Sequence, residues 1–130
     1  MVNTDLKYAT LSNARMRNAN LEYARMKDAT LFHTHLYDAN LTNAFLVEAN
    51  LYDANLCYAN LYKAILEDAD LFRANLQAAK LRHAKLGGAN LENVKLENVD
   101  LSDLDLRGIP REKIEQFIND FRASEKTGSL

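Results

Sequence analysis

The chain has 130 residues, with 16 basic and 18 acidic side chains and a formal net charge of −2. This length suffices for one domain with a core, and the near balance of charge argues against a polyanion binder. A single cysteine, Cys57, excludes an internal disulfide. No apolar run approaches the length of a membrane span, and the N-terminal residues lack a signal-peptide pattern. We therefore expect no membrane association and a cytoplasmic location.

A five-residue repeat runs through most of the sequence. Its centre is Leu or Met, at Leu6 and at every fifth position up to Leu106, which makes 21 centres, 19 of them Leu. A small residue stands two positions before each centre up to Leu91 and is Ala in most of these repeats, whereas the last three repeats carry the larger Val94, Val99 and Leu104. The residue between them is Asn or Asp in 11 of the 21 repeats, as in "ANLYDANLCYAN", residues 49–60.

This period fits neither a helix nor a flat strand. At about 100° per residue, five residues advance about 500°, so the leucines would not form one buried stripe on a helix. In a flat strand, residues five apart point to opposite faces. A short extended segment that bends once per repeat satisfies the pattern, because the small residue and the leucine share one side. Repeated bending in one sense predicts a coil with leucine and alanine inside.

The outward residues indicate how many bends close one coil, since residues one coil apart should stack. At a spacing of 20, three sets align and a spacing of 15 gives no comparable register, although a spacing of ten shows part of the same pattern. The aligned sets are Phe32, Tyr52 and Phe72, then Asn20, Asn40 and Asn60, and finally Asp28, Glu48 and Asp68. We therefore predict four sides per coil.

The tandem A[N/D]LXX motif resembles that of the pentapeptide-repeat proteins, from Thr4 to about Gly108. The resemblance implies an all-β solenoid, namely a right-handed quadrilateral parallel β-helix lined by leucine and alanine. Its 21 repeats correspond to about five coils of 20 residues. We expect residues 1–108 to form this β-helix.

The sequence "GIPREKIEQFINDF" that follows predicts a helix over 110–122, with Pro110 at its first position. We expect 109–122 to cap the last coil and 123–130 to form a flexible tail. The helix would cover the coil with one apolar face, composed of Ile114, Phe117, Ile118 and Phe121. A rival interpretation is a dimer contact, since gyrase-inhibiting relatives are understood to dimerise through their C-terminal ends. No cap is visible before the first repeat.

Stacked aromatic residues are the leading candidates for a binding surface. They could contact a partner protein, or they could only support the coil, which we favour. The proposed protein-contact residues are Phe32, Tyr52 and Phe72, with Tyr37 and Tyr62 on neighbouring faces.

The aligned acidic residues could imitate DNA phosphates, as in the quinolone-resistance members of the family. A solvated face is the favoured interpretation, because basic residues lie nearby at Lys27, Lys63 and Arg73. Four further basic residues replace the Asn or Asp of the motif, at Arg15, Arg25, Lys85 and Lys95.

No catalytic, cofactor or metal site is predicted. His33 and His35 occupy different outward positions and have no third ligand at suitable spacing, so we expect both to face solvent. Cys57, directly after Leu56, should also lie near the surface. A filled prism lacks the concavity that an active site needs.

These observations predict a non-catalytic structural or protein-interaction module with an unidentified protein partner. Binding of nucleic acid or membrane is not expected, and the chain should be a monomer or a homodimer through one end of the solenoid. The alternative function is inhibition of DNA gyrase by DNA mimicry.

Overall fold

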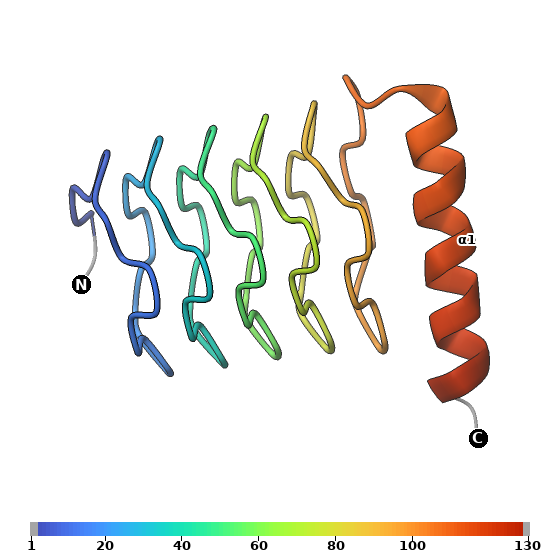
Figure 1. Cartoon of the computed structure of the whole chain (residues 1–130), viewed down its shortest axis with the longest axis horizontal. Helices are drawn as coiled ribbons and strands as arrows, with labels where there is room; N and C mark the ends of the chain where they lie inside the picture. The colour runs from blue at the N-terminus through green and yellow to red at the C-terminus, as the bar shows by residue number, and fades with distance from the viewer. Residues whose placement is uncertain (1–2, 129–130) are drawn as a thin grey trace.

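The computed structural model describes residues 3–128 and shows a solenoid of stacked four-sided coils with one helix at its C-terminal end (Figure 1). The residue directly before each central Leu or Met points outward from a side of the coil. It forms a single-residue parallel bridge with the residue 20 positions later, from Asp5↔Arg25 to Lys85↔Asp105. The predicted spacing of 20 is therefore confirmed. The fold is a right-handed quadrilateral β-helix, as expected, and among the described residues its strands are no longer than these single bridges.

A tight turn forms each corner of the coil. The N–H of the small residue donates to the carbonyl of the preceding leucine, as from Ala54 to Leu51 at 2.9 Å. The second central residue has a positive φ, between 54° and 63° in 20 non-glycine residues, which identifies type II turns. Asn or Asp occupies 11 of these 20 positions, because short polar side chains tolerate the left-handed region best.

The Asn or Asp of the motif completes the hydrogen bonding of each repeat. In pentad 54–58, three N–H groups donate to carbonyls of adjacent coils at 2.8–2.9 Å, and that of Ala54 closes the turn. The fifth N–H, of Cys57, donates to Asn55 Oδ1 at 3.1 Å. The same bond forms in all 11 repeats that carry Asn or Asp at this position. The motif therefore satisfies every backbone donor of its pentad.

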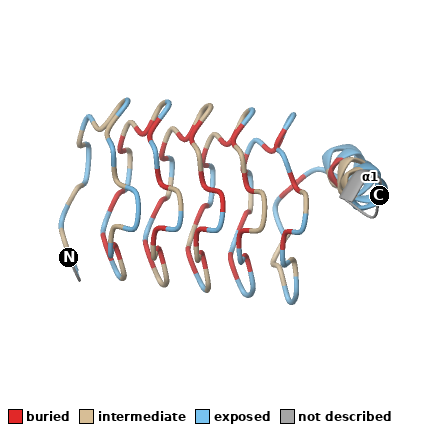
Figure 2. Ribbon diagram, turned by 90° about the horizontal axis from the view of Figure 1, so that it is seen from below, coloured by how far each residue is buried: buried red, intermediate tan, exposed pale blue. Residues whose placement is uncertain are grey.

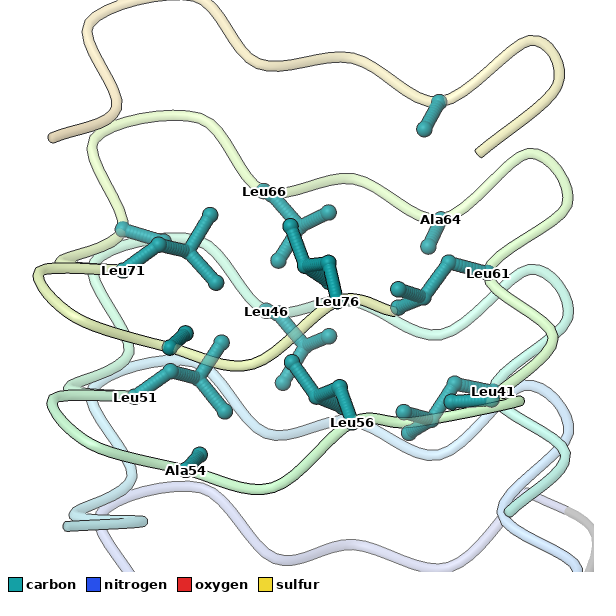
Figure 3. Close-up of a cluster of buried hydrophobic side chains, with 14 of the residues drawn as sticks. Leu41, Leu46, Leu51, Ala54, Leu56, Leu61, Ala64, Leu66, Leu71 and Leu76 are labelled. Atoms are coloured by element: carbon teal, nitrogen blue, oxygen red, sulfur yellow. The ribbon is translucent and has the colours of Figure 1, made fainter. Parts of the chain in front are cut away.

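The central residues and the small residues fill the interior. Leucines one coil apart lie above one another, as Leu41 and Leu61 do in Figure 3. From Leu21 to Leu66 every central Leu or Met is 0% exposed. Thr34 is also fully buried, and its Oγ1 donates to the carbonyl of Leu11 at 2.9 Å. Because the coils are filled, outward side chains stand on a rigid support.

The N-terminal coil is less well covered than the others. Its central residues Leu6, Leu11 and Met16 are only partly buried, and Figure 2 shows no buried segment in this coil. They have a neighbouring coil on one side only, whereas the central residues of the middle coils have one on both sides.

Helix α1 spans Arg111–Gly128. It begins after Pro110, whose carbonyl accepts from the N–H groups of Lys113 and Ile114 at 3.0 and 3.1 Å. The helix is longer than the predicted 110–122, and most of the segment predicted as a tail is helical. Arg, Ala, Glu and Lys in "RASEKTG", residues 122–128, are good helix formers, and no glycine or proline interrupts them before Gly128. Residues 129 and 130 lie outside the described part.

Helix α1 lies across the end of the last coil (Figures 1 and 2). Phe117 is 4% exposed and belongs to the core, with Ile114 and Phe121 partly buried against it. An ion pair between Lys113 and Glu92 ties the helix to the solenoid. Ile118 is 39% exposed, so its predicted place in the covering face is wrong. At i+1 from Phe117 it is rotated about 100° away from the contact.

Candidate functional site: ladders of outward side chains

Three aromatic side chains form a continuous stack at one corner of the coil, which we call the aromatic ladder: Phe32, Tyr52 and Phe72. Ring centroids are 5.0 Å apart between Phe32 and Tyr52 and 5.2 Å apart between Tyr52 and Phe72, with interplanar angles of 21° and 20°. Each ring stands at the first central position of a turn and is half-buried. The predicted alignment of these residues is therefore correct, while their role as protein contacts stays a prediction.

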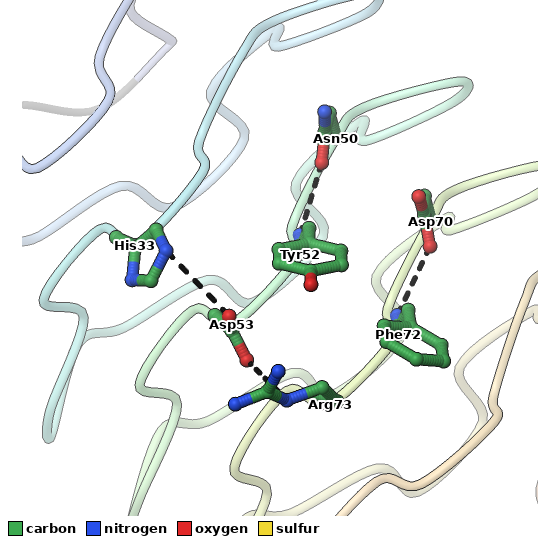
Figure 4. A network of polar contacts seen from close by, with 7 residues as sticks. All are labelled: His33, Asn50, Tyr52, Asp53, Asp70, Phe72 and Arg73. Carbon is green, nitrogen blue, oxygen red and sulfur yellow. Dashed lines mark hydrogen bonds and ion pairs between the residues drawn. The ribbon is translucent and has the colours of Figure 1, made fainter.

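Polar side chains hold the ladder from both sides (Figure 4). The N–H groups of Tyr52 and Phe72 donate to Asn50 and Asp70, each at 3.0 Å. These bonds fix the turns that carry the rings.

Residues 20 positions apart form a column along the solenoid, and the second turn position of the same corner carries the column of His33, Asp53 and Arg73. Asp53 lies between two basic side chains, 3.1 Å from Arg73 Nε and 3.5 Å from His33 Nε2 (Figure 4). The corner thus presents a stacked aromatic strip beside a column in which Asp53 pairs with Arg73 and lies close to the His33 ring.

Tyr37 and Tyr62 lie at two other corners, apart from the aromatic ladder. Tyr37 contacts the Tyr58 ring edge-on at 5.4 Å, and the Arg17 guanidinium lies 4.6 Å from its centroid. Tyr62 meets the His83 ring edge-on at 5.7 Å.

The acidic column, defined as Asp28, Glu48 and Asp68, occupies the second turn position at a single corner. Lys27 pairs with Asp28 at 3.9 Å. Arg73 pairs instead with Asp53, and Lys63 stands at a different corner. Only one of the three nearby basic residues therefore neutralises this column directly.

Cys57 is 7% exposed, so the expectation that it lies near the surface is wrong. It stands in one column with Tyr37 and Gln77, which lie 20 residues before and after it. Burial raises the pKa of the Cys57 thiol, which keeps it protonated and weakly nucleophilic.

His33 and His35 are exposed, as expected, and belong to different columns. Within residues 3–128, no group of three or more His, Cys, Asp or Glu side chains is placed to hold a metal ion.

The sequence analysis did not single out two hydrophobic residues that stand where the motif usually has Asn or Asp. Phe45 and Ile65 occupy this outward position in successive coils and bridge one another. Phe45 is 42% exposed. The signal was present, because these are the two apolar residues at a position that is otherwise polar or charged.

The described surface carries shallow hollows between its ladders. One of about 480 Å³ lies beside Ile65, lined also by Lys63 and Lys85. Another of about 600 Å³ lies between α1 and the last coils, near Leu91 and Phe117.

Solved structures with this architecture include a pentapeptide repeat protein from the Arabidopsis thaliana thylakoid lumen. Its TM-score is 0.73 at 26% identity, over 75% of this chain and 68% of that one. A pentapeptide repeat protein, Rfr23, from the cyanobacterium Cyanothece is 37% identical over 78% of this chain and 63% of its own length, with a TM-score of 0.49. Trypsin-treated QnrB1, a plasmid-mediated fluoroquinolone resistance protein, gives 20% identity and a TM-score of 0.51, over 81% of this chain and 68% of that one. Comparison with curated protein sequences gives no significant match.

These comparisons correct one expectation. The predicted cytoplasmic location is wrong as an inference, because the first of these proteins has the same repeat architecture in the thylakoid lumen. The repeats encode the coil and carry no signal for a compartment. Over residues 3–128, no helix combines the length and the hydrophobicity needed to cross a bilayer.

The family comparison agrees with the geometry of the coils. A family model described as "Pentapeptide repeats (8 copies)" matches residues 1–36, 34–71 and 74–109, which together cover nearly the whole solenoid. The matched segments coincide with the bridged coils and end where the chain leaves the last coil for α1. The chain belongs to the pentapeptide repeat family.

Proposed function

We propose that this chain is a non-catalytic module that binds a partner protein through rigid ladders of outward side chains. The observation that carries the proposal is the aromatic ladder, in which the centroids of neighbouring rings lie 5.0 and 5.2 Å apart on a filled solenoid. A surface already ordered before binding loses little conformational entropy on association. Aromatic residues are also enriched at protein interfaces.

Two further observations support a non-catalytic role. The outward side chains are arranged in ladders on the flat sides and corners of a filled prism, and the hollow beside Ile65 is open to solvent. The buried thiol of Cys57 is held protonated, which disfavours it as a nucleophile.

The test is affinity capture from the cell of origin with the full chain as bait. A specific partner should bind the wild type and should be lost with Phe32→Ser/Tyr52→Ser/Phe72→Ser. The control Tyr37→Ser/Tyr58→Ser removes two rings at another corner and should retain the partner. Circular dichroism melting of each variant separates lost binding from lost folding. Absence of a specific partner with the wild type would contradict the proposal.

Gyrase inhibition is the alternative that a second assay addresses. The likeness to QnrB1, at 20% identity, concerns the fold alone. Pairing of Lys27 with Asp28 interrupts the negative column that DNA mimicry would require. Excess protein should therefore leave gyrase supercoiling unchanged, and inhibition would replace the present proposal.

A further inference from the structure

One face of the solenoid departs from the motif in four successive coils. We call its outward residues the stripe: Arg25, Phe45, Ile65 and Lys85, which bridge one another in this order. On each of the other three faces, at least two outward positions are Asn or Asp. This face also carries two, Asp5 and Asp105, but both stand at its ends, so the four positions between them lack Asn and Asp.

This departure removes hydrogen bonds that the motif supplies elsewhere. The N–H groups of Val47 and Glu67 follow Phe45 and Ile65 in the sequence, so no Asn or Asp side chain precedes them to accept the turn bond. Phe45 does not compensate by burial, since it is 42% exposed, and Ile65 is only partly buried. A local rule that is broken without structural gain points to a selected surface.

Exposed hydrophobic residues concentrate around the stripe. Five large hydrophobic residues are exposed among those described, and three of them lie on this face or its two corners. Phe45 belongs to the stripe, Tyr23 is 43% exposed at one corner and Tyr8 is 71% exposed at the other. Clustering of this kind is typical of protein interfaces.

The same face carries cations without close carboxylate partners. Within residues 3–128, Arg25, Lys63 and Lys85 form no ion pair with a carboxylate, and Lys85 acts on Asp105 only at longer range. The hollow beside Ile65 contains Lys63 and Lys85. Its two carboxylates are already engaged, Asp103 with Arg82 and Asp105 with Arg107. The hollow thus offers positive charge next to apolar surface.

We propose that the stripe binds an extended acidic segment of a partner protein, with apolar side chains between its carboxylates. The apolar side chains of the segment would pack on Phe45 and Ile65. Its carboxylates would pair with Lys63 and with Arg25 and Lys85, the two ends of the stripe. From Arg25 to Lys85 the stripe rises by three coils, about 14 Å, which about four or five extended residues span. The acidic column, Asp28 to Asp68, lies at one corner of this face and Lys63 lies at the other, so the carboxylates of the segment would lie on the Lys63 side. A nucleic acid carries charge at every residue and lacks the apolar side chains that would pack on Phe45 and Ile65. This inference rests on the proposed role as a protein-binding module and names a surface separate from the aromatic ladder.

The experiment selects a phage-displayed library of random peptides on the immobilised full chain. Enriched peptides should combine Asp or Glu with aliphatic or aromatic residues. A fluorescent copy of the leading peptide is then titrated by anisotropy at low and high salt, and high salt should weaken its binding.

The decisive variant is Phe45→Asn/Ile65→Asn, which restores the motif and offers two new turn bonds, so it should melt no lower than the wild type. Its affinity for the peptide should fall by about tenfold or more, as expected when a central apolar contact is removed. Lys63→Glu/Lys85→Glu should weaken binding similarly. The matched control Thr10→Asn/Thr30→Asn restores the motif at the same position on another face and should bind normally.

Selection of no peptide, or of basic peptides, would overturn the proposal. So would equal affinity for wild type and Phe45→Asn/Ile65→Asn. Displacement of the peptide by a single-stranded DNA oligonucleotide would assign the stripe to nucleic acid instead. The variant Phe32→Ser/Tyr52→Ser/Phe72→Ser should keep its peptide affinity, which distinguishes failure of the aromatic ladder from failure of the stripe.

Discussion

The first coil and the middle coils contain the same inward residue types but bury them to different extents. Leu6 and Leu11 stay partly exposed, whereas Leu56 is 0% exposed. At the other end, α1 replaces a coil only in part, because Leu101 and Leu106 remain partly buried beneath it. Burial in this fold therefore comes from the neighbours on either side of a repeat, as in other solenoids.

The largest effect is expected for a leucine in a middle coil. Leu56→Ala should lower the free energy of unfolding by about 2–5 kcal/mol, because the cavity is closed on every side. Leu6→Ala should cost less, about 1 kcal/mol, since Leu6 is only partly buried. Urea denaturation of both variants measures the difference. Equal losses would mean that coil neighbours do not determine burial.

The next effect concerns the helical lid. Phe117 is 4% exposed, so Phe117→Ala should cost about 3 kcal/mol, at the lower end for a buried aromatic because it contacts one coil end. Hydrogen exchange should rise most in the last coil. Ile118→Ala, at an exposed site on the same helix, should change stability by less than about 0.5 kcal/mol. Similar losses for both would refute the packing of α1.

A smaller effect is expected at a close approach between the last two coils. A Cβ added to Gly87 would lie 2.6 Å from the carbonyl oxygen of Arg107, a backbone atom. Gly87→Ala should therefore displace the last coil and cost about 1–3 kcal/mol. Glu67→Ala, at the same position one coil earlier, should be nearly neutral. Thermal melting compares the two, and a neutral Gly87→Ala would show that the last coil moves freely.

The turn bond of the motif should contribute less again. Asn55→Ala removes the acceptor of the Cys57 N–H and should cost about 1 kcal/mol. His35→Ala changes the same column one coil earlier, where no such bond forms, and should cost less. Chemical denaturation measures the free energy of unfolding of both variants. An equal loss would show that the turn bond does not explain the preference for Asn or Asp in the motif.

The smallest effect is a dependence on acidic pH. Hydrogen bonds from the Arg107 side chain and N–H lower the pKa of Asp105 to about 2. Because the folded pKa is depressed, the contribution is present above the unfolded pKa of about 3.9 and is lost as pH falls towards about 2. Asp105→Asn should flatten the stability profile between these values. If the dependence of stability on pH is the same in Asp105→Asn and in the wild type, the exposed pair of Asp105 and Arg107 does not contribute to stability.

Much of the surface could be read only in three dimensions. Cys57 directly follows Leu56 in the sequence, which predicts a place near the surface, yet it is only 7% exposed between the adjacent coils. Phe45 and Ile65 were visible as departures from the motif, but their adjacency in a stripe depends on the spacing of 20. The end of α1 was misplaced because residues 122–128 have helical propensity without an apolar pattern.

The sequence by itself determined the coil, because one leucine every five residues can be buried on one side only if the chain bends at each repeat. It also determined the stacking of Phe32, Tyr52 and Phe72 once the spacing of 20 was accepted. Only the tertiary structure decided how deeply each repeat is buried, which cations lack carboxylates and which outward residues share a face. The physical reason is that the repeat specifies contacts within a pentad, whereas burial and charge depend on neighbours 20 residues away.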